Sequence, residues 1–357
     1  MQGLNELEYI CWQGPRRAIG LAQPREGQPI VRTAAKVALG VLVALCVAAL
    51  IAVAVYRDVP AEELEAAFAQ PPSRFMMIDG VRIHYRDEGN GPTIVLLHAN
   101  YSSLYMWEPW VERLRSRYRI IRLDLPAHGL TGPAPDNDYT LERMQSLFEG
   151  FIAAQRLERF VLAGTSIGGT IAMRYAADHP DRVAQLVLIS PGSLEPRVRG
   201  RTTPVEIPAI VNVLAYITPR SFTRYMLSND YGDPARLDEA IVTQWYTMWR
   251  REGNRLAMLE LLRQYVSGGV EGKIRAVQAP VLLLWGEHNR RVPVALAYET
   301  RALLENAAEV RLEILPGVGH MLVQEAPQQS AAIIEGYLAQ KYPSTTTPFR
   351  ISADVFP

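Results

Sequence analysis

The chain has 357 residues, of which 48% are hydrophobic and 21% charged, so its composition favours a packed core over disorder. Lys and Arg together number 37, as do Asp and Glu, and this balance argues against a nucleic-acid-binding protein. The only cysteines are Cys11 and Cys46, so the chain beyond them has no thiol for a disulfide or a zinc cluster.

Charge and hydropathy divide the N-terminal part of the chain into a basic segment and an apolar segment. Residues 1–36 carry five basic and three acidic side chains, and residues 37–56 form a run of twenty residues without a charge. A helix of this length spans roughly 30 Å, the thickness of the hydrocarbon core of a bilayer. The positive-inside rule then predicts a single-pass anchor at 37–56, with residues 1–36 in the cytoplasm and the remainder outside it.

Two alternatives to an anchor are a buried core helix and a cleaved signal peptide. A core helix is rarely apolar on every face over twenty residues. The triplet Ala52-Val53-Ala54 resembles a cleavage site, but the apolar run exceeds the usual ~7–15 residues of a signal peptide and follows a long leader. We therefore prefer the uncleaved anchor.

The next elements in chain order are a linker and a hairpin. Residues 57–74 are expected to contain a short acidic helix and a Pro-Pro linker, and the folded core is expected to start near Phe75. The alternating stretch around Asp79-Gly80 is a hairpin signal.

Strands and helices then alternate. Runs of apolar residues predict strands buried on both faces at 93–98, 118–125, 159–164, 182–190, 280–286 and 310–317. Helical spacing recurs between several of them, at 139–156, 167–178, 294–306 and 326–340. This order predicts an α/β fold with a mostly parallel sheet flanked by helices.

One interval interrupts the alternation. Residues 192–275 contain no convincing strand and are rich in aromatic residues and methionine at helical spacing, which predicts a helical cap inserted between two core strands. Most of these aromatic side chains are expected to form the core of the cap, and some to line a pocket beneath it. The remaining core would comprise residues 75–191 and 276–342, followed by a Pro/Thr-rich tail at 343–357.

The motif with the clearest chemistry is Gly164-Thr165-Ser166-Ile167-Gly168-Gly169. It lies between a predicted strand and a predicted helix, the context in which G-x-S-x-G forms a sharp turn that exposes a nucleophilic serine. A serine hydroxyl needs a base near neutral pH. Of the six histidines, His320 is the best candidate for that base, because it stands on a glycine-rich loop after the last strand. No metal or cofactor is implied.

The chain from about 75 to 340 resembles the α/β-hydrolase fold superfamily, in its capped bacterial branch of serine hydrolases. The resemblance rests on LLHANYSSLYMW (96–107), DLPAHGLTG (124–132), GTSIGG (164–169), HPDRVAQLVLIS (179–190), LLLWGEHNRRVP (282–293) and GVGHM (317–321). It implies a triad of Ser166, an acid and His320. It also implies an oxyanion hole formed by the backbone N–H groups of Ile167 and Asn100.

The acid position departs from the family pattern. The family usually has Asp where this chain has Asn289, and the alternative acid position at the end of the strand before the cap holds Ser190. Three interpretations follow. Another carboxylate, Glu195 or Glu287, replaces the acid; Asn289 orients His320 in a slow or specialised enzyme; or catalysis is lost and the pocket only binds a ligand. Two milder departures are Ala99 and Ala127, where the family usually has glycine.

The leading expectation is a membrane-anchored serine hydrolase that acts on a small or medium apolar ester through an acyl-enzyme on Ser166. Its domain would lie on the periplasmic side of a bacterial inner membrane. The alternatives are a non-catalytic binding protein and a haloperoxidase, perhydrolase or carbon–carbon bond hydrolase using the same site. The expected partners are a small-molecule substrate and, through 37–56, the membrane, but no nucleic acid. The motifs specify neither the substrate nor the oligomeric state.

Overall fold

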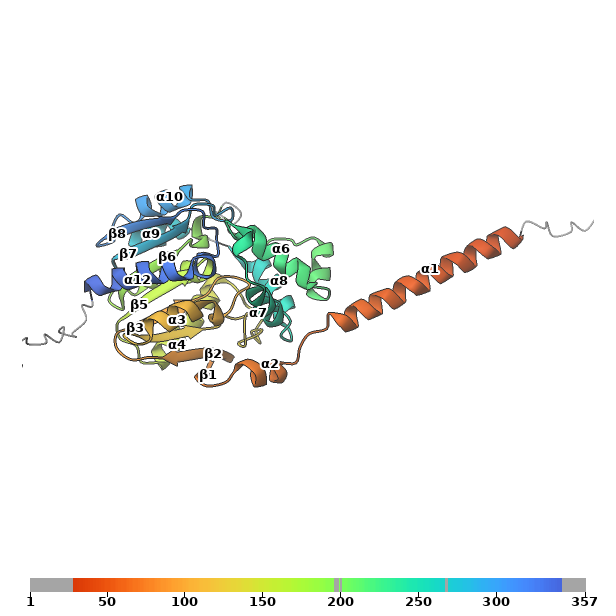
Figure 1. Cartoon of the computed structure of the whole chain (residues 1–357), viewed down its shortest axis with the longest axis horizontal. Coiled ribbons are helices and arrows are strands. Elements are labelled where there is room, and N and C mark those ends of the chain that lie inside the picture. Colours follow the sequence, from red (N-terminus) through yellow and green to blue (C-terminus); the bar gives the residue numbers. More distant parts are fainter. Residues whose placement is uncertain (1–27, 196–198, 200, 267–268, 342–357) are drawn as a thin grey trace, which may run out of the picture. The chain divides into compact units, whose positions relative to one another are not determined.

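The computed structural model describes residues 28–195, 199, 201–266 and 269–341 (Figure 1). Cys11 and the expected tail at 343–357 lie outside these residues. Contacts along the chain divide it into two compact units, Met1–Ala52 and Val53–Pro357.

The second unit is built on one eight-stranded sheet with the order β1-β2-β4-β3-β5-β6-β7-β8. Strands β3 to β8 are parallel, whereas β2 pairs antiparallel with both β1 and β4. The predicted α/β class with a mostly parallel sheet is therefore confirmed. The strands are β1 Ser73–Ile78, β2 Val81–Glu88, β3 Thr93–Leu97, β4 Arg119–Leu123, β5 Phe160–Thr165, β6 Val183–Ile189, β7 Val281–Gly286 and β8 Val310–Leu315.

The local sequence explains the strands and the first turn. Central strands β5 and β7 are buried at every position, which is why their sequences read as unbroken apolar runs. The predicted hairpin joins β1 and β2: Ile78 pairs with Val81, and both intervening residues, Asp79 and Gly80, have positive φ. A two-residue turn with positive φ at both positions matches the right-handed twist of the strands it connects.

Helices pack against the sheet in two groups. One comprises α3 Glu108–Leu114, α11 Leu322–Glu325 and α12 Pro327–Lys341, and the other comprises α4 Leu141–Ala154, α5 Ile167–Asp178, α9 Val270–Ala276 and α10 Ala295–Leu303. A short 3-10 helix, η1 Leu104–Trp107, precedes α3.

A helical insertion, called the cap below, lies between β6 and β7. Among its described residues it contains η2 Gly192–Leu194, η3 Ala209–Ala215, α6 Arg220–Asp230, η4 Pro234–Arg236, α7 Glu239–Trp249 and α8 Asn254–Gln264. Several cap aromatics are buried, including Tyr231, Trp245 and Trp249, as expected for the cap's own core.

The N-terminal elements are α1 Gln28–Val55 and α2 Ala61–Phe68. Within α1, residues Thr33–Val55 are long and apolar enough to cross a membrane, and none of the most apolar window is buried by the protein. The segment 57–74, expected to be a linker, contains α2, and its first residues already bond to the cap: Val59 N–H donates to the Arg250 carbonyl at 2.6 Å.

Candidate active site

Ser166 stands on the sharp turn between β5 and α5. Its backbone has φ +53° and ψ −119°, a strained conformation that side-chain-bearing residues rarely adopt. The neighbouring glycines are required by close approach. A Cβ on Gly164 would lie 2.3 Å from the Gly168 carbonyl oxygen, and one on Gly168 would lie 2.4 Å from the Leu97 carbonyl oxygen.

The expected oxyanion donors come from two segments that this packing brings together. Gly168 contacts the backbone of Leu97 and His98, so the start of α5, with Ile167, lies against the end of β3, which leads to Asn100. Backbone N–H groups in the first turn of a helix have no partner inside the helix. Ile167 occupies that position in α5, and the side-chain oxygen of Asn100 accepts from Tyr101 N–H at 2.9 Å.

A buried cluster of polar side chains supports this loop. Asp124 accepts from His84 Nδ1 at 2.7 Å and from the backbone N–H groups of Leu104 and Leu130 at 2.7 and 2.8 Å. Burial alone would raise the pKa of Asp124, but the hydrogen bond and the charge of His84 hold the pKa below its usual value. The carboxylate thus fastens three segments around the loop that carries Asn100.

His98 and His128 are both buried beside that loop. His98 Nδ1 donates to the Ala99 carbonyl at 2.8 Å, and its Nε2 accepts from Leu125 N–H at 2.9 Å, an arrangement that a neutral ring satisfies on both sides. Burial lowers the pKa of His98, and burial together with the nearby His98 lowers the pKa of His128 to about 3. The two contacts of the His98 ring hold the loop that follows His98.

The acid position is occupied by a buried amide, Asn289, next to Ser190 and His320. Asn289 Nδ2 lies 3.1 Å from His320 Nδ1 and donates to Ser190 Oγ at 3.0 Å. The amide oxygen of Asn289 accepts from the backbone N–H groups of Arg291 and Val292 at 3.1 and 2.9 Å. The structure therefore brings Asn289 and His320 together, and it places Ser190 beside them at the end of β6.

These contacts define which way the amide points. Backbone N–H groups only donate, so the oxygen of Asn289 must face Arg291 and Val292, and its NH2 group must face the imidazole. His320 Nδ1 then acts as an acceptor, which places the proton of a neutral ring on Nε2. A general base for serine needs the opposite tautomer, with Nε2 free to accept the hydroxyl proton.

The two glutamates considered as substitute acids have other surroundings. The Glu287 side chain is half exposed, and it accepts from Gly317 N–H at 3.0 Å. Glu195 lines a pocket of about 610 Å³ that it shares with Asp230, Arg290 and Arg291. Asn289 Nδ2, at 3.1 Å, lies within hydrogen-bond distance of His320 Nδ1.

Several residues that the sequence analysis did not single out connect the cap to the His320 loop. The carbonyl of Asp230, at the end of cap helix α6, accepts from His320 N–H at 2.6 Å, and its carboxylate pairs with Arg291 at 2.7 and 2.9 Å. The buried carboxylate of Glu325 accepts from the backbone N–H groups of Gly319, Gly232 and Asp233 at 2.7, 3.0 and 2.9 Å. The cap and the loop that carries the expected base are therefore fastened at two points.

The cap also places a hydroxyl next to the turn that holds Ser166. Tyr265 OH lies 3.2 Å from Thr170 Oγ1, which accepts from Ser193 Oγ at 3.2 Å. Burial raises the pKa of Tyr265 to about 12, so this group stays a neutral hydroxyl at physiological pH.

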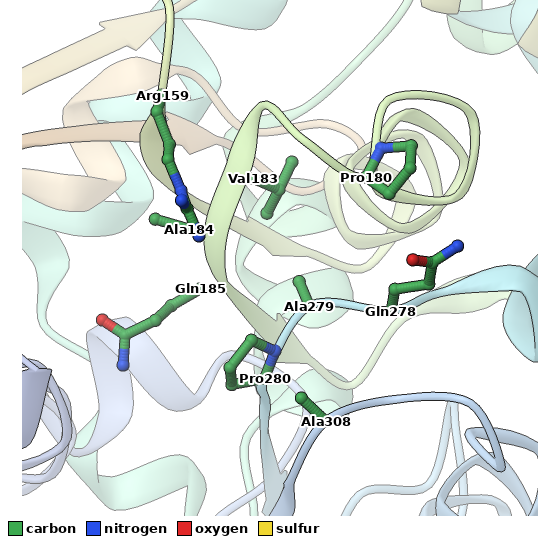
Figure 2. Close-up of a pocket in the computed structure, with 9 residues that line it drawn as sticks. All are labelled: Arg159, Pro180, Val183, Ala184, Gln185, Gln278, Ala279, Pro280 and Ala308. Atoms are coloured by element: carbon green, nitrogen blue, oxygen red, sulfur yellow. The ribbon is translucent and has the colours of Figure 1, made fainter.

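A second hollow, of about 620 Å³, lies at the opposite edge of the sheet, where β6 and β7 begin (Figure 2). None of the sequence-predicted site residues lines it. It is lined by Arg159, Pro180, Val183, Ala184, Gln185, Gln278, Ala279, Pro280 and Ala308. Because this lining includes no histidine, serine or carboxylate, it offers no pair of nucleophile and base.

Comparisons with known proteins agree with the fold. A family model described as alpha/beta hydrolase fold matches residues 92–231. A 2-hydroxy-6-oxo-6-(2'-aminophenyl)hexa-2,4-dienoic acid hydrolase of Metapseudomonas resinovorans is 26% identical over 78% of this chain and 94% of its own length. A pimeloyl-[acyl-carrier protein] methyl ester esterase of Nitrosomonas europaea is 29% identical over 69% of this chain and 96% of its own length.

Solved structures share the architecture as well. The crystal structure of a membrane phospholipase A has a TM-score of 0.61 and 24% identity, and the match covers 87% of this chain and 99% of that one. The family model, the similarity to solved structures and the eight-stranded, mostly parallel sheet lead to one conclusion: the chain has the α/β-hydrolase fold.

Proposed function

We propose that the chain is a slow serine hydrolase that cleaves carboxylic esters. Ser166 attacks the carbonyl carbon, His320 removes the serine proton, and the Ile167 and Asn100 N–H groups bind the oxyanion. The alcohol then leaves, and water releases the acyl group from Ser166. The observation that carries this proposal is the position of Ser166 on the strained turn at φ +53°, in a chain whose relatives are hydrolases.

The slow rate follows from the neutral acid position. To free Nε2, His320 must shift its proton to Nδ1, where it would face the NH2 group of Asn289, or the amide must turn and give up its bonds from Arg291 and Val292. Replacing the triad Asp by Asn in a serine protease lowers turnover by about 10⁴. That factor corresponds to about 5 kcal/mol of transition-state stabilisation.

An ester is the preferred substrate class. The name of the relative from Nitrosomonas europaea is that of a methyl ester esterase. In addition, a weakly activated serine attacks an ester carbonyl more easily than an amide carbonyl. Buried aromatic side chains of the cap, including Trp245 and Trp249, favour an apolar acyl or alcohol group.

We further propose that α1 is an uncleaved membrane anchor, with the N-terminus in the cytoplasm and the hydrolase unit on the other side of a bacterial inner membrane. The 23 residues Thr33–Val55 suffice for a span. The mature protein should therefore keep α1 and sediment with membranes after an alkaline carbonate wash. A mature N-terminus at or near Val55 would contradict the anchor.

One observation favours a second candidate, a binding protein without turnover. It is the fixed orientation of the Asn289 amide, which directs a donor at His320. A fluorophosphonate probe distinguishes the two candidates, because it reacts only with an activated serine.

The test uses the full chain in detergent, with Ser166→Ala and the matched control Ser193→Ala, which removes another buried serine near the same turn. We expect slow labelling of the parent, loss of labelling in Ser166→Ala and no change in Ser193→Ala. A parent that does not label at any probe concentration, while keeping its folded circular dichroism spectrum, would overturn the hydrolase proposal and favour the binding protein.

A further inference from the structure

The chain that leaves α1 is bonded directly to the cap. The guanidinium of Arg255, on cap helix α8, donates to the Tyr56 carbonyl at 2.7 Å and to the Asp58 carboxylate at 2.9 Å. Arg250 donates to the Arg57 carbonyl at 2.8 and 3.1 Å. The pinned segment Tyr56–Asp58 therefore follows the last residue of α1 without an intervening spacer.

Chain length then sets how far the cap can be from the membrane. The span Thr33–Val55 has 23 residues and a length of roughly 34 Å, slightly more than a hydrocarbon core of about 30 Å. Consecutive Cα atoms are ~3.8 Å apart, so Tyr56–Asp58 stays within roughly 12 Å of the end of the span. The headgroup layer on each side is about 5–8 Å thick. The pinned face of the cap must consequently lie at the membrane surface.

Apolar side chains are exposed on the same part of the cap. Ile210, Val213 and Tyr216 on and after η3 are 75%, 44% and 54% exposed, and Leu256 on α8 is 51% exposed. We call these four side chains the cap apolar face. They contrast with Leu64, on α2 beyond the pinned segment, which is 4% exposed.

The elements that carry the cap apolar face are joined to each other and to the pinned segment. Arg263 of α8 donates to the Asn212 side chain of η3 at 2.7 Å. Arg255, which holds Tyr56, also reaches Thr218 Oγ1 at 3.4 Å, two residues after Tyr216. Outside α1, most of the exposed large hydrophobic side chains in the described part of the chain belong to the cap: Ile210, Val213, Tyr216, Tyr225 and Leu256, against Met77 and Tyr298 elsewhere.

We propose that the cap apolar face docks into the bilayer that α1 enters. A soluble protein rarely leaves large apolar side chains clustered near one surface without a partner, and here the tether brings a lipid surface to them. The proposal rests on α1 being an anchor, and it is independent of whether Ser166 is catalytic.

The test places an environment-sensitive fluorophore on single cysteines in the full chain, after Cys11→Ser and Cys46→Ala. The labelled positions on the cap are Ile210→Cys, Val213→Cys and Leu256→Cys. The aqueous controls are Met77→Cys and Tyr298→Cys, which replace exposed apolar residues outside the cap, and Leu45→Cys reports the anchor. The protein is reconstituted in phosphatidylcholine and phosphatidylglycerol vesicles with a brominated lipid as quencher.

We expect the cap labels and the Leu45 label to be quenched at least threefold more than the two controls. If the cap labels behave like the controls while the Leu45 label is quenched, docking is overturned and the anchor stands. If the Leu45 label also stays in water, the anchor itself fails, and docking fails with it. Quenching of every label, controls included, would overturn a docking surface specific to the cap.

A second variant tests whether the apolar side chains themselves bind lipid. Ile210→Asp with Leu256→Asp changes exposed positions only, so folding should be unaffected. The quenching of a Val213→Cys label should then fall at least threefold. Unchanged quenching would show that the tether alone holds the cap near the membrane, which overturns the role of the cap apolar face.

Discussion

The two sides of the candidate site differ in whether a carboxylate stands among their buried side chains. On the nucleophile side, Ser166, the glycines around it and the buried Asp124 cluster form a strained, closely packed arrangement with a carboxylate at its centre. On the acid side, Ser190, Asn289 and His320 are equally buried, but the group that contacts the imidazole is a neutral amide.

The comparison separates geometry from charge. The acid side has the hydrogen bonds that position an imidazole, since Asn289 is held by two backbone N–H groups and the His320 backbone by Asp230. What it lacks is the negative charge that fixes the reactive tautomer and stabilises the imidazolium. Under the proposed function, one atom of one side chain would lower the rate while the architecture of the site stays intact.

The largest expected effect comes from Asn289→Asp. A carboxylate would still accept from Arg291 and Val292, and it would accept from His320 Nδ1 instead of donating to it. We expect fluorophosphonate labelling and ester turnover to rise by about 10³–10⁴. Asn306→Asp, an exposed change of the same kind, should alter neither rate. A rise of less than tenfold would mean that charge is not what the acid side lacks.

The second-largest effect is expected from Glu325→Gln and is a loss of folding stability. Glu325→Gln replaces a carboxylate that accepts three backbone N–H groups, and an amide would turn a donor toward one of them. We expect a loss of about 2–3 kcal/mol in unfolding free energy and a fall in Tm of roughly 4–12 °C. Glu287→Gln, at a half-exposed carboxylate with one such bond, is the calorimetric control and should shift Tm by less than about 2 °C. Equal shifts in Tm would show that the three hydrogen bonds of Glu325 stabilise the fold no more than the single bond of Glu287 does.

The third effect tests the nucleophile side by pH. The folded-state pKa values of His98 and His128 are lowered, so below about pH 6.5 the unfolded chain binds protons that the folded chain does not. Stability should therefore be highest above pH 6.5 and fall as pH decreases, by about 1 kcal/mol between pH 6.5 and 5.5 for each ring that stays neutral. Urea unfolding at both pH values measures this. His98→Asn should reduce the loss, whereas His288→Asn, at an exposed histidine, should not. A parent with equal stability at both pH values would contradict neutral buried rings.

The smallest expected effect is from Ser190→Asp. Ser190 occupies the alternative acid position, and its Oγ already bonds to Asn289 Nδ2. Its φ of +41° is a conformation that Asp tolerates better than most residues. A carboxylate there would restore negative charge near His320 without a direct bond, so we expect turnover to rise about tenfold, or about 1.4 kcal/mol. Ser193→Asp supplies the matched control. A decrease in turnover would show that charge at this position does not reach the imidazole.

The sequence predicted the strands and the Ser166 turn well because both have strong local causes. Apolar runs locate buried strands, and the glycines at 164, 168 and 169 are needed wherever a strand, a tight turn and a helix meet. The resemblance to the hydrolase family put Asn289 at the acid position, and the structure places it 3.1 Å from His320, on the loops that follow the neighbouring strands β7 and β8. Helix α3 was not anticipated, since its seven residues are too few to show a clear helical period.

Other features depend on contacts between distant segments and leave no local pattern. Glu325 reads as an ordinary acidic residue in a short helix, yet its carboxylate bonds to two cap residues more than ninety positions earlier. The direction of the Asn289 amide likewise depends on which backbone groups surround it. The sequence therefore placed Asn289 near His320, but it predicted neither the contacts of Glu325 nor the direction of the Asn289 amide.

The bond from His320 N–H to the Asp230 carbonyl has a consequence for how such proteins can be recombined. A cap is often regarded as an exchangeable module that tunes substrate choice above a constant catalytic base. Here the end of α6 supports the loop that carries His320, so grafting a foreign cap onto this core would also move the histidine. Cap and core therefore cannot be exchanged separately without disturbing the histidine. A chimera would need Asp230 to Asp233 retained together with Glu325 to keep the histidine in place.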